Sequence, residues 1–561
     1  MRFRIRCPFV TVALVALLAV APAVTPVAAA PQPAGGKCAL AADSGTAPPP
    51  AGGLFEPVAP LPVSFAVGLV RLASDRFAVT DRHLDQVVLL DARGDSTGVL
   101  AYPAYEPSAL AWDGRMLVAA DGENGRIYFL DPRRDECVRT IESPLAGVTG
   151  VAADAEGRLW IAARGQEVLQ LIDPHDGTTL REIPAPTPRV SALAWDPDGY
   201  LWAADSSRDA VFLVDVASGY TIFGLDAPGP VCNGLWRDGP WLYATDYQTD
   251  TLYRARVDDL HGRTLRDDSR RGRVTLWCDV QNLGPGTITG GTVALALPAD
   301  GDNQELDDAT WTGGAVVKTD QWGQKVALYD LGTLGPGEKR SFRLRATGTF
   351  HRVSTKIYPH RVGKLSDIPR DIREQYLADA DKYRIHDPFI QQTVREVAGD
   401  ATNPYVVARK LYEFLIGRIN YQMVGGWDIA PTVIRRGTGS CSEYTFAYVA
   451  LCRAAGIPAR YVGSLVLRGE DASVDTAFHR WAEIYLPGVG WIPVDVNAGD
   501  DPLQADRCFS FGGIANRFLI TTRGGGDSTL LGWDYDLRVR YRTRGKANVR
   551  TEQFAEWDVA P

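Results

Sequence analysis

The most informative stretch of the chain is residues 437–460, which read GTGSCSEYTFAYVALCRAAGIPAR. A glycine-rich turn leads into a predicted helix with Cys441 at its start, and Tyr444, Tyr448 and Leu451 recur on one face of that helix. The positive end of a helix dipole lowers the pKa of a thiol placed there, which makes the thiol a nucleophile. A cysteine alone is commonly a packing residue, so this interpretation needs partners elsewhere in the sequence.

Two later motifs supply those partners. Residues 478–485 read FHRWAEIY, and residues 488–495 read GVGWIPVD. Both are typical of strands, and the turn between them is short, so His479 and Asp495 can lie on neighbouring strands. A histidine beside a cysteine takes the thiol proton, and an aspartate on the far ring nitrogen orients the ring. The sequence therefore predicts a catalytic triad of Cys441, His479 and Asp495.

The order G-x-C-x-E, H-R-W-x-E and G-W-x-P-V-D resembles the transglutaminase-like superfamily over about residues 370–535. The resemblance implies a papain-like α+β core that transfers acyl groups from amides, for cross-linking in some members and for hydrolysis in others. It also implies an oxyanion donor upstream of the cysteine, for which Tyr421 is the candidate and Trp427 the alternative. No metal site and no cofactor are expected.

A repeat fills the N-terminal half of the chain. Short apolar strands and Asp-Gly-type turns recur every 41 or 42 residues, in five clear copies centred on Gly68, Ala109, Gly150, Ala192 and Gly234. This period predicts a β-propeller and resembles the NHL/SMP-30-type propellers. A sixth copy could be assembled from flanking strands. After the third-strand-like segment, four copies carry an aspartate and the remaining copy carries Arg164. We interpret the aspartates as turn residues and not as a ligand site; they are Asp81, Asp121, Asp205 and Asp246.

The predicted fold class is multi-domain: an all-β propeller and a β-sandwich, followed by an α+β papain-like transglutaminase core. The domain boundaries place a signal peptide first and a tail last. They are 1–29 for the signal peptide, 30–61 for a linker, 62–260 for the propeller, 271–350 for an immunoglobulin-like sandwich, 365–540 for the catalytic domain and 541–561 for the C-terminal tail.

The first residues are typical of a secretory signal peptide, with Arg2, Arg4 and Arg6 ahead of an apolar run and small residues up to Ala30. We expect a secreted or periplasmic protein without stable membrane insertion after cleavage. Seven cysteines remain after cleavage, and Cys232 with Cys278 is the preferred disulfide pair. The net charge of −9 disfavours nucleic acid as a partner.

These features predict an exported cysteine protease or amidase that acts on a protein or cell-envelope peptide through a thioester. The propeller and the sandwich would bind substrate or a partner. One alternative is a cross-linking transglutaminase with an amine acceptor. Another is a non-catalytic binding or scaffold protein, and a third is a lactonase-type propeller enzyme, for which converging metal ligands are not evident.

Overall fold

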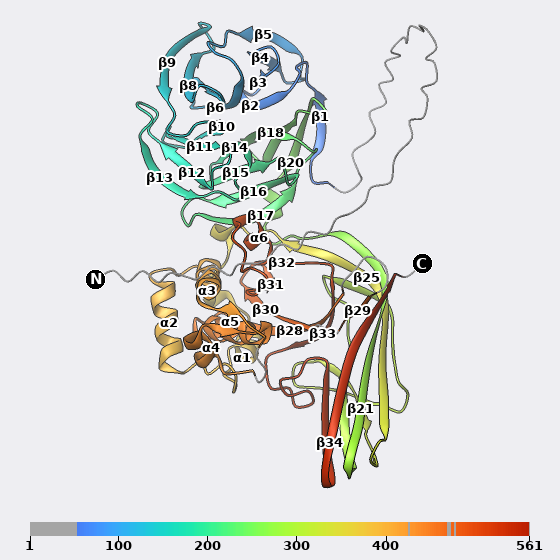
Figure 1. Ribbon diagram of the computed structural model, residues 1–561. Coiled ribbons are helices and arrows are strands. Elements are labelled where there is room, and N and C mark those ends of the chain that lie inside the picture. Colours follow the sequence, from blue (N-terminus) through green and yellow to red (C-terminus); the bar gives the residue numbers. More distant parts are fainter. Residues whose placement is uncertain (1–52, 424–426, 468–472, 476–477, 560–561) are drawn as a thin grey trace, which may run out of the picture. The chain divides into compact units, whose positions relative to one another are not determined.

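The computed structural model describes residues 53–423, 427–467, 473–475 and 478–559 (Figure 1). About half of the chain is strand, at 51%, and 14% is helix. The predicted signal peptide (1–29), Cys38 and most of the predicted linker lie outside the described residues.

Five four-stranded antiparallel sheets form the N-terminal part, from residue 56 to residue 256. In four of them the strands pair in sequence order: β2–β5 (Ala66–Ala73, Arg76–Asp81, Gln86–Asp91, Ser96–Leu100), β6–β9 (Pro107–Trp112, Leu117–Asp121, Arg126–Asp131, Glu136–Glu142), β10–β13 (Val148–Ala153, Leu159–Ala163, Val168–Ile172, Thr179–Pro184) and β14–β17 (Val190–Asp196, Tyr200–Asp205, Ala210–Asp215, Tyr220–Asp226).

The fifth sheet joins the two ends of this region. It contains β18 (Cys232–Asp238), β19 (Trp241–Asp246) and β20 (Thr251–Arg256), and its outer strand is β1 (Glu56–Pro60). The first strand of each sheet contacts the first strand of the next, and β18 contacts β2, so the sheets close a ring. We call residues 56–256 the sheet ring. Residues 56–60, which the sequence analysis placed in the linker, instead form β1 and pair with β20.

The recurring aspartates of the sheet ring are turn residues, as predicted. Asp121 Oδ1 accepts the backbone N–H groups of Glu123 and Asn124 at 2.8 Å each. The carboxylates of Asp81, Asp205 and Asp246 accept backbone N–H groups in the same way. All four are buried, so each carboxylate satisfies the donors of a tight turn.

A long bent sheet follows the ring. It consists of β21 (Thr264–Ala296), β22 (Gln304–Trp311), β23 (Val316–Thr319), β24 (Lys325–Asp330), β25 (Lys339–Thr355), β29 (Ser473–Asp475), β32 (Gly513–Ile514) and β34 (Leu537–Val559). The Tyr329 and Phe342 rings, from different parts of the sheet, lie 4.7 Å apart in one shared core. Backbone pairing joins all eight strands into one sheet. The division into the two sheets of a sandwich therefore stays a prediction.

The last strand of this sheet includes residues that the sequence analysis placed in a tail. Residues 541–559 belong to β34, which pairs with β21 along most of its length (Figure 1). Ala555 and Trp557 are buried in the core of the sheet. The alternation of polar and apolar residues here is that of a half-buried strand.

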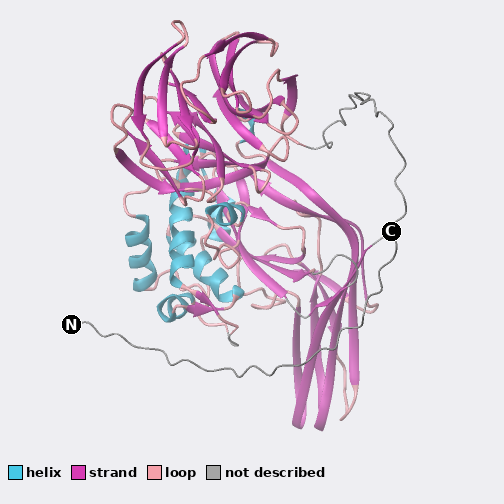
Figure 2. Cartoon of the chain, turned by 45° about the horizontal axis from the view of Figure 1, so that its top comes forward, coloured by secondary structure: helices cyan, strands magenta, loops and turns pink. Residues whose placement is uncertain are grey.

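The helices cluster in the C-terminal part of the chain (Figure 2). They are α1 (Arg370–Tyr376), α2 (Pro388–Ala398), α3 (Pro404–Arg418), α4 (Ala430–Arg436), α5 (Cys441–Ala454) and α6 (Gln504–Phe509), with short 3-10 turns at Asp258–Leu260, Pro359–Arg361 and Leu365–Asp367. Asp387 and Asn403 cap α2 and α3, as their Asp-Pro and Asn-Pro pairs predict. Among the described residues, no helix combines the length and apolarity needed to span a bilayer.

Helix α5 packs against a four-stranded sheet of order β31-β30-β28-β33. These strands are β28 (Ala459–Val466), β30 (Phe478–Leu486), β31 (Gly490–Val494) and β33 (Phe518–Gly524). A short parallel pair, β26 (Asn420–Tyr421) with β27 (Thr438–Gly439), lies just before α5 in the chain. This unit carries all the residues of the predicted triad.

The predicted disulfide between Cys232 and Cys278 is wrong. Both thiols are free and buried, and they belong to different core clusters, one shared with the sheet ring and one in the long sheet. Each fills apolar space as a small hydrophobic side chain. Cys452, on α5, is also fully buried.

A buried ion pair in the sheet ring gives a test of the fold. Arg237 Nε lies 2.8 Å from Asp196 Oδ2, and both side chains are almost completely buried. Trp202 Nε1 donates to the same oxygen at 3.0 Å. Because Arg237→Met would leave Asp196 buried without its cation, we expect a loss of roughly 3–5 kcal/mol in the free energy of unfolding. Denaturant unfolding followed by tryptophan fluorescence measures it.

The matched control is Arg370→Met, which removes one partner of an exposed ion pair with Glu374. Exposed pairs contribute little, so this variant should unfold like the parent. Equal stability of the two variants would contradict the buried pairing in the sheet ring.

Candidate active site

The first turn of α5 is fixed by Glu443, a carboxylate that is only 1% exposed. Glu443 Oε2 accepts the backbone N–H of Ser440 at 2.9 Å, which completes a capping box with the Ser440 side chain. Glu443 Oε1 accepts the backbone N–H of Asp428 at 3.0 Å and Nη2 of Arg436 at 2.9 Å. One buried carboxylate therefore ties the end of α4 and the preceding loop to the residue next to Cys441.

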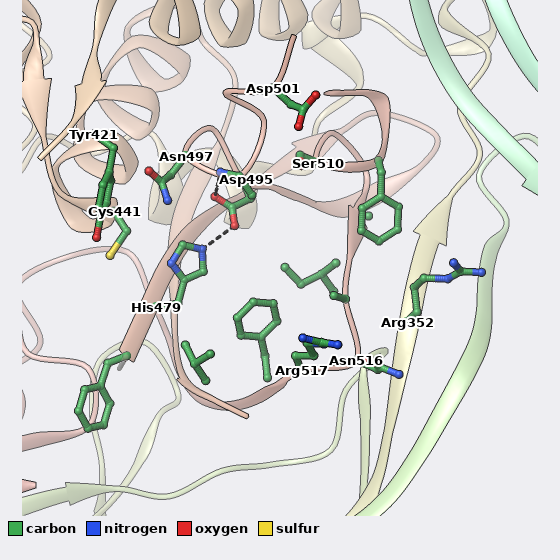
Figure 3. Close-up of a pocket in the computed structure, with 18 of the residues that line it drawn as sticks. Arg352, Tyr421, Cys441, His479, Asp495, Asn497, Asp501, Ser510, Asn516 and Arg517 are labelled. Atoms are coloured by element: carbon green, nitrogen blue, oxygen red, sulfur yellow. Dashed lines mark hydrogen bonds and ion pairs between the residues drawn. The ribbon is translucent and has the colours of Figure 1, made fainter. Parts of the chain in front are cut away.

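The structure brings Cys441, His479 and Asp495 together (Figure 3). Cys441 is the first residue of α5, His479 lies on β30, and Asp495 directly follows β31. His479 Nε2 is 2.5 Å from Asp495 Oδ2, and the His479 ring also hydrogen-bonds the Cys441 side chain. The ring stacks on Phe518, with centroids 5.5 Å apart. The imidazole is thus held between a thiol and a carboxylate in the order that nucleophilic catalysis needs.

The electrostatics of the three groups favour an ion pair. Burial raises the pKa of Cys441, but the hydrogen bond and charge of His479, with the backbone N–H and charge of Arg480, lower that pKa below its usual value. Burial opposes the charged form of His479, yet the charge and hydrogen bond of Asp495 raise its pKa to about 10. A thiolate and an imidazolium therefore coexist from the lowered pKa of Cys441 up to about pH 10.

Cys441 opens onto a cleft with a volume of about 980 Å³. Tyr421 and Asn497 lie near the thiol, and Arg352, Asn516 and Arg517 lie across the cleft (Figure 3). Apolar side chains line the space between, including those of Val466, Phe478, Ile514 and Phe518. The cleft has room for a segment of several residues, with the reacting carbonyl at Cys441.

Tyr421 lies where an oxyanion donor is expected. The parallel pairing of Tyr421 with Gly439 places its ring beside Cys441 (Figure 3). Its side chain is about half exposed to the cleft. Burial, followed by the charge of Cys441, raises the pKa of Tyr421, so the phenol keeps its proton to donate.

The other residues considered near the cysteine have structural contacts. Trp427 packs against Phe446 and Tyr535 with its backbone at φ +36°. Arg435 lies over the Phe389 ring, and Arg436 forms ion pairs with Glu443 and Asp428. Neither arginine lines the cleft.

Sequence reasoning missed two features of the site. The capping role of Glu443 can be read from the Ser-x-x-Glu spacing of residues 440–443, but the sequence analysis did not use it. The burial of Arg480 had no local signal, because its neighbours come from four separate segments.

The role of Asp495 can be tested by Asp495→Asn. Removing the charge should lower the pKa of His479 from about 10 toward or below its ordinary value, because burial still disfavours the imidazolium. The thiolate loses its counter-ion, so alkylation of Cys441 at pH 7 should fall at least ~10-fold, equivalent to one unit of pKa. The rate of iodoacetamide labelling, followed by peptide mass spectrometry, measures this.

Asp501→Asn is the matched control, since Asp501 also lines the cleft but does not contact His479. Equal labelling rates for Asp495→Asn and the parent would show that His479 does not depend on this carboxylate.

Comparison with known proteins places the three residues in one matched region. Residues 391–496 match the transglutaminase-like superfamily. An uncharacterized protein of Haemophilus influenzae is 30% identical over 237 residues, which cover 36% of this chain and 62% of that protein. The chain thus spans less than two thirds of the length of this relative.

Two solved structures show weaker likeness. One is a proposed cysteine protease from Cytophaga hutchinsonii, with 16% identity and a TM-score of 0.37, covering 52% of this chain and 92% of that one. The other is a glutaminyl cyclase from Myxococcus xanthus, with 18% identity and a TM-score of 0.32, covering 36% and 98%. At these TM-scores neither likeness bears on fold or reaction. From residue 391 to residue 496, the chain contains a transglutaminase-like domain.

Proposed function

We propose that the chain is an exported cysteine protease or amidase that cleaves amide bonds of a protein or cell-envelope peptide through a thioester. The observation that carries the proposal is the Cys441–His479–Asp495 arrangement at a cleft large enough for a peptide. The transglutaminase-like match over residues 391–496 supports it.

Each group has one task in this reaction. The Cys441 thiolate attacks the amide carbonyl, and the C–N bond breaks as His479 gives its proton to the leaving amine. Neutral His479 then takes a proton from water, and the resulting hydroxide attacks the thioester. The C–S bond breaks, the acid is released, and the Cys441 thiolate re-forms beside protonated His479. Asp495 keeps the ring oriented and stabilises its charged form in both halves.

The tetrahedral oxyanion needs donors at the thiol. The backbone N–H of Cys441 lies in the first turn of α5, where N–H groups have no partner within the helix. The phenol of Tyr421 is the second donor in this proposal. Removing one such donor typically slows turnover by about 10²–10³-fold.

We further propose that the sheet ring is a five-bladed β-propeller that binds substrate or a partner. Its five sheets, the closure of β1 onto β20 and the contact of β18 with β2 support this. Arg208 of β15–β16 forms two hydrogen bonds, at 2.8 and 2.9 Å, to Asp506, which also lines the cleft. The loop of the ring that carries Arg208 therefore contacts a residue of the cleft wall.

The first test is selective labelling of Cys441 at pH 6 with iodoacetamide. We expect Cys441 to react far faster than the buried thiols, because only an activated and accessible thiolate reacts at this pH. His479→Ala should reduce its rate toward that of an ordinary thiol. Peptide mass spectrometry identifies the labelled cysteine.

Cys137, which is exposed and lies far from His479 in the sequence, is the internal control. Labelling of Cys137 ahead of Cys441 would contradict an activated nucleophile and would favour a binding or scaffold protein.

Tyr421→Phe separates nucleophile activation from transition-state stabilisation. We expect unchanged labelling of Cys441 but a fall in peptide hydrolysis of about 10-fold or more, because only the oxyanion donor is lost. Gln422→Ala, a change at the next residue, should retain activity. A parental rate for Tyr421→Phe would remove Tyr421 from the mechanism.

Adding a primary amine to the same assay shows whether water or an amine accepts the acyl group from the thioester. Release of free acid supports hydrolysis, whereas incorporation of the amine, seen as a mass increase of the acyl product, identifies the cross-linking alternative.

A further inference from the structure

Arg480 follows His479 on β30, and its side chain is completely buried. Successive residues of a strand point to opposite faces, so Arg480 extends away from the cleft, under α5. Four aromatic rings surround its guanidinium group. Their centroids lie 4.7, 5.0, 4.7 and 4.2 Å from the guanidinium carbon, for Trp427, Phe446, Tyr461 and Tyr535 respectively.

Among the described residues, no carboxylate forms an ion pair with this guanidinium group. Nη2 donates to the carbonyl of Trp533 at 2.5 Å, whereas Nε and Nη1 have no hydrogen-bond partner. Two acids lie nearby, but burial raises the pKa of Asp534 and raises that of Asp536 to about 8. Asp536 instead accepts a hydrogen bond from Thr521. Arg480 is therefore a buried cation that no carboxylate of the described residues meets within ion-pair distance, an arrangement that is rare because it is destabilising.

The charge of the triad explains why a cation is placed here. In the ion-pair form, Asp495 and Cys441 are negative and only His479 is positive, so the three groups carry one excess negative charge in a largely buried site. Arg480 brings this site to neutrality. Resting on the proposed function, we infer that Arg480 balances the negative charge of the Cys441 nucleophile, as a positioning residue that does not touch the substrate.

Contacts connect Arg480 to the nucleophile directly. Its backbone N–H hydrogen-bonds the Cys441 side chain, and the Thr445 hydroxyl bridges the carbonyls of Cys441 and Arg480 at 2.8 and 3.1 Å. The aromatic faces attract the cation without cancelling its charge. Charge–charge interactions are strong where water is excluded, so the guanidinium acts on the thiolate through the protein.

The decisive experiment compares Arg480→Met with Arg480→Lys. Methionine fits an aromatic cage but carries no charge, whereas lysine keeps the charge. We expect Arg480→Met to move the midpoint of Cys441 alkylation up by about one pH unit, so that labelling at pH values below the midpoint of the parent falls about 10-fold. Arg480→Lys should stay within about 3-fold of the parent, a shift below half a unit. Circular dichroism and thermal unfolding establish that each variant is folded.

Other charged or titratable groups face the pair and must be kept constant. They are His479, Asp495 and Tyr421 around Cys441, and Asp534, Asp536, Tyr383, Tyr461 and Tyr535 around Arg480.

Arg409→Met is the matched control. Arg409 is equally buried and lies 5.1 and 5.3 Å from the ring centroids of Tyr412 and Phe511, but Glu413 balances its charge at 2.8 Å. Removing Arg409 should leave the alkylation midpoint of Cys441 unchanged. A shift as large as that of Arg480→Met would overturn the specific role of Arg480.

Asp536→Asn tests the inference without removing the arginine. If Arg480 has no carboxylate counter-ion at pH 6, labelling at this pH should not change. A several-fold increase would show that Asp536 already balances Arg480, and would overturn the inference. This near-isosteric change keeps the test decisive even when Arg480→Met does not fold.

The outcomes separate this inference from the proposed function. An unreactive Cys441 in the parent protein would reject the proposed enzyme. A reactive Cys441 with the same pH profile in folded Arg480→Met would reject only the role of Arg480.

Discussion

The hydrogen bond between His479 and Asp495 is the constraint on which the rest of the site depends. It requires β30 and β31 to pair in one register, with Ala482 opposite Val494, so that the aspartate emerges beside the ring. Asp495 is itself held, because its N–H donates to the carbonyl of Ser510 and its second oxygen accepts from the N–H of Ala498. A slip of one residue would move His479 to the opposite face of the sheet.

The position of Cys441 has a separate origin. Helix α5 is buried along nearly its whole length, and Glu443 fixes its first turn through three donors. Cys441 and His479, the proposed nucleophile and base, thus come from two rigid elements that pack against each other, whereas Tyr421, the proposed side-chain oxyanion donor, comes from a short two-residue strand. Precise placement of catalytic groups is best achieved on such supported elements.

Much of this arrangement was predictable from the sequence, and the reasons are local. The triad residues lie in motifs whose strand and helix character is clear, and the helix starts at Asp387 and Asn403 follow from capping chemistry. The period of 41 or 42 residues predicted five repeated sheets, but it did not show that residues 56–60 complete the last one.

The remaining features could not be predicted because they depend on contacts between residues far apart in the sequence. The role of β34 depends on pairing with a strand more than 240 residues earlier in the chain, for example Ala555 with Leu276. Cys232 and Cys278 are close in sequence but belong to different cores. The aromatic enclosure of Arg480 likewise assembles residues 427, 446, 461 and 535, which no local pattern connects.

In the proposed acyl transfer, the two cations of the site, His479 and Arg480, differ in what they can do. His479 must give up its charge when it protonates the leaving amine, whereas an arginine does not deprotonate in proteins. With Arg480 included, the site is neutral as the thiolate–imidazolium pair, as the tetrahedral oxyanion beside imidazolium, and as the thioester beside neutral histidine. Without it, every one of these states carries a buried negative charge. A permanent cation next to a transient one therefore removes the electrostatic penalty from each step, which is the physical reason for a buried arginine beside the catalytic histidine.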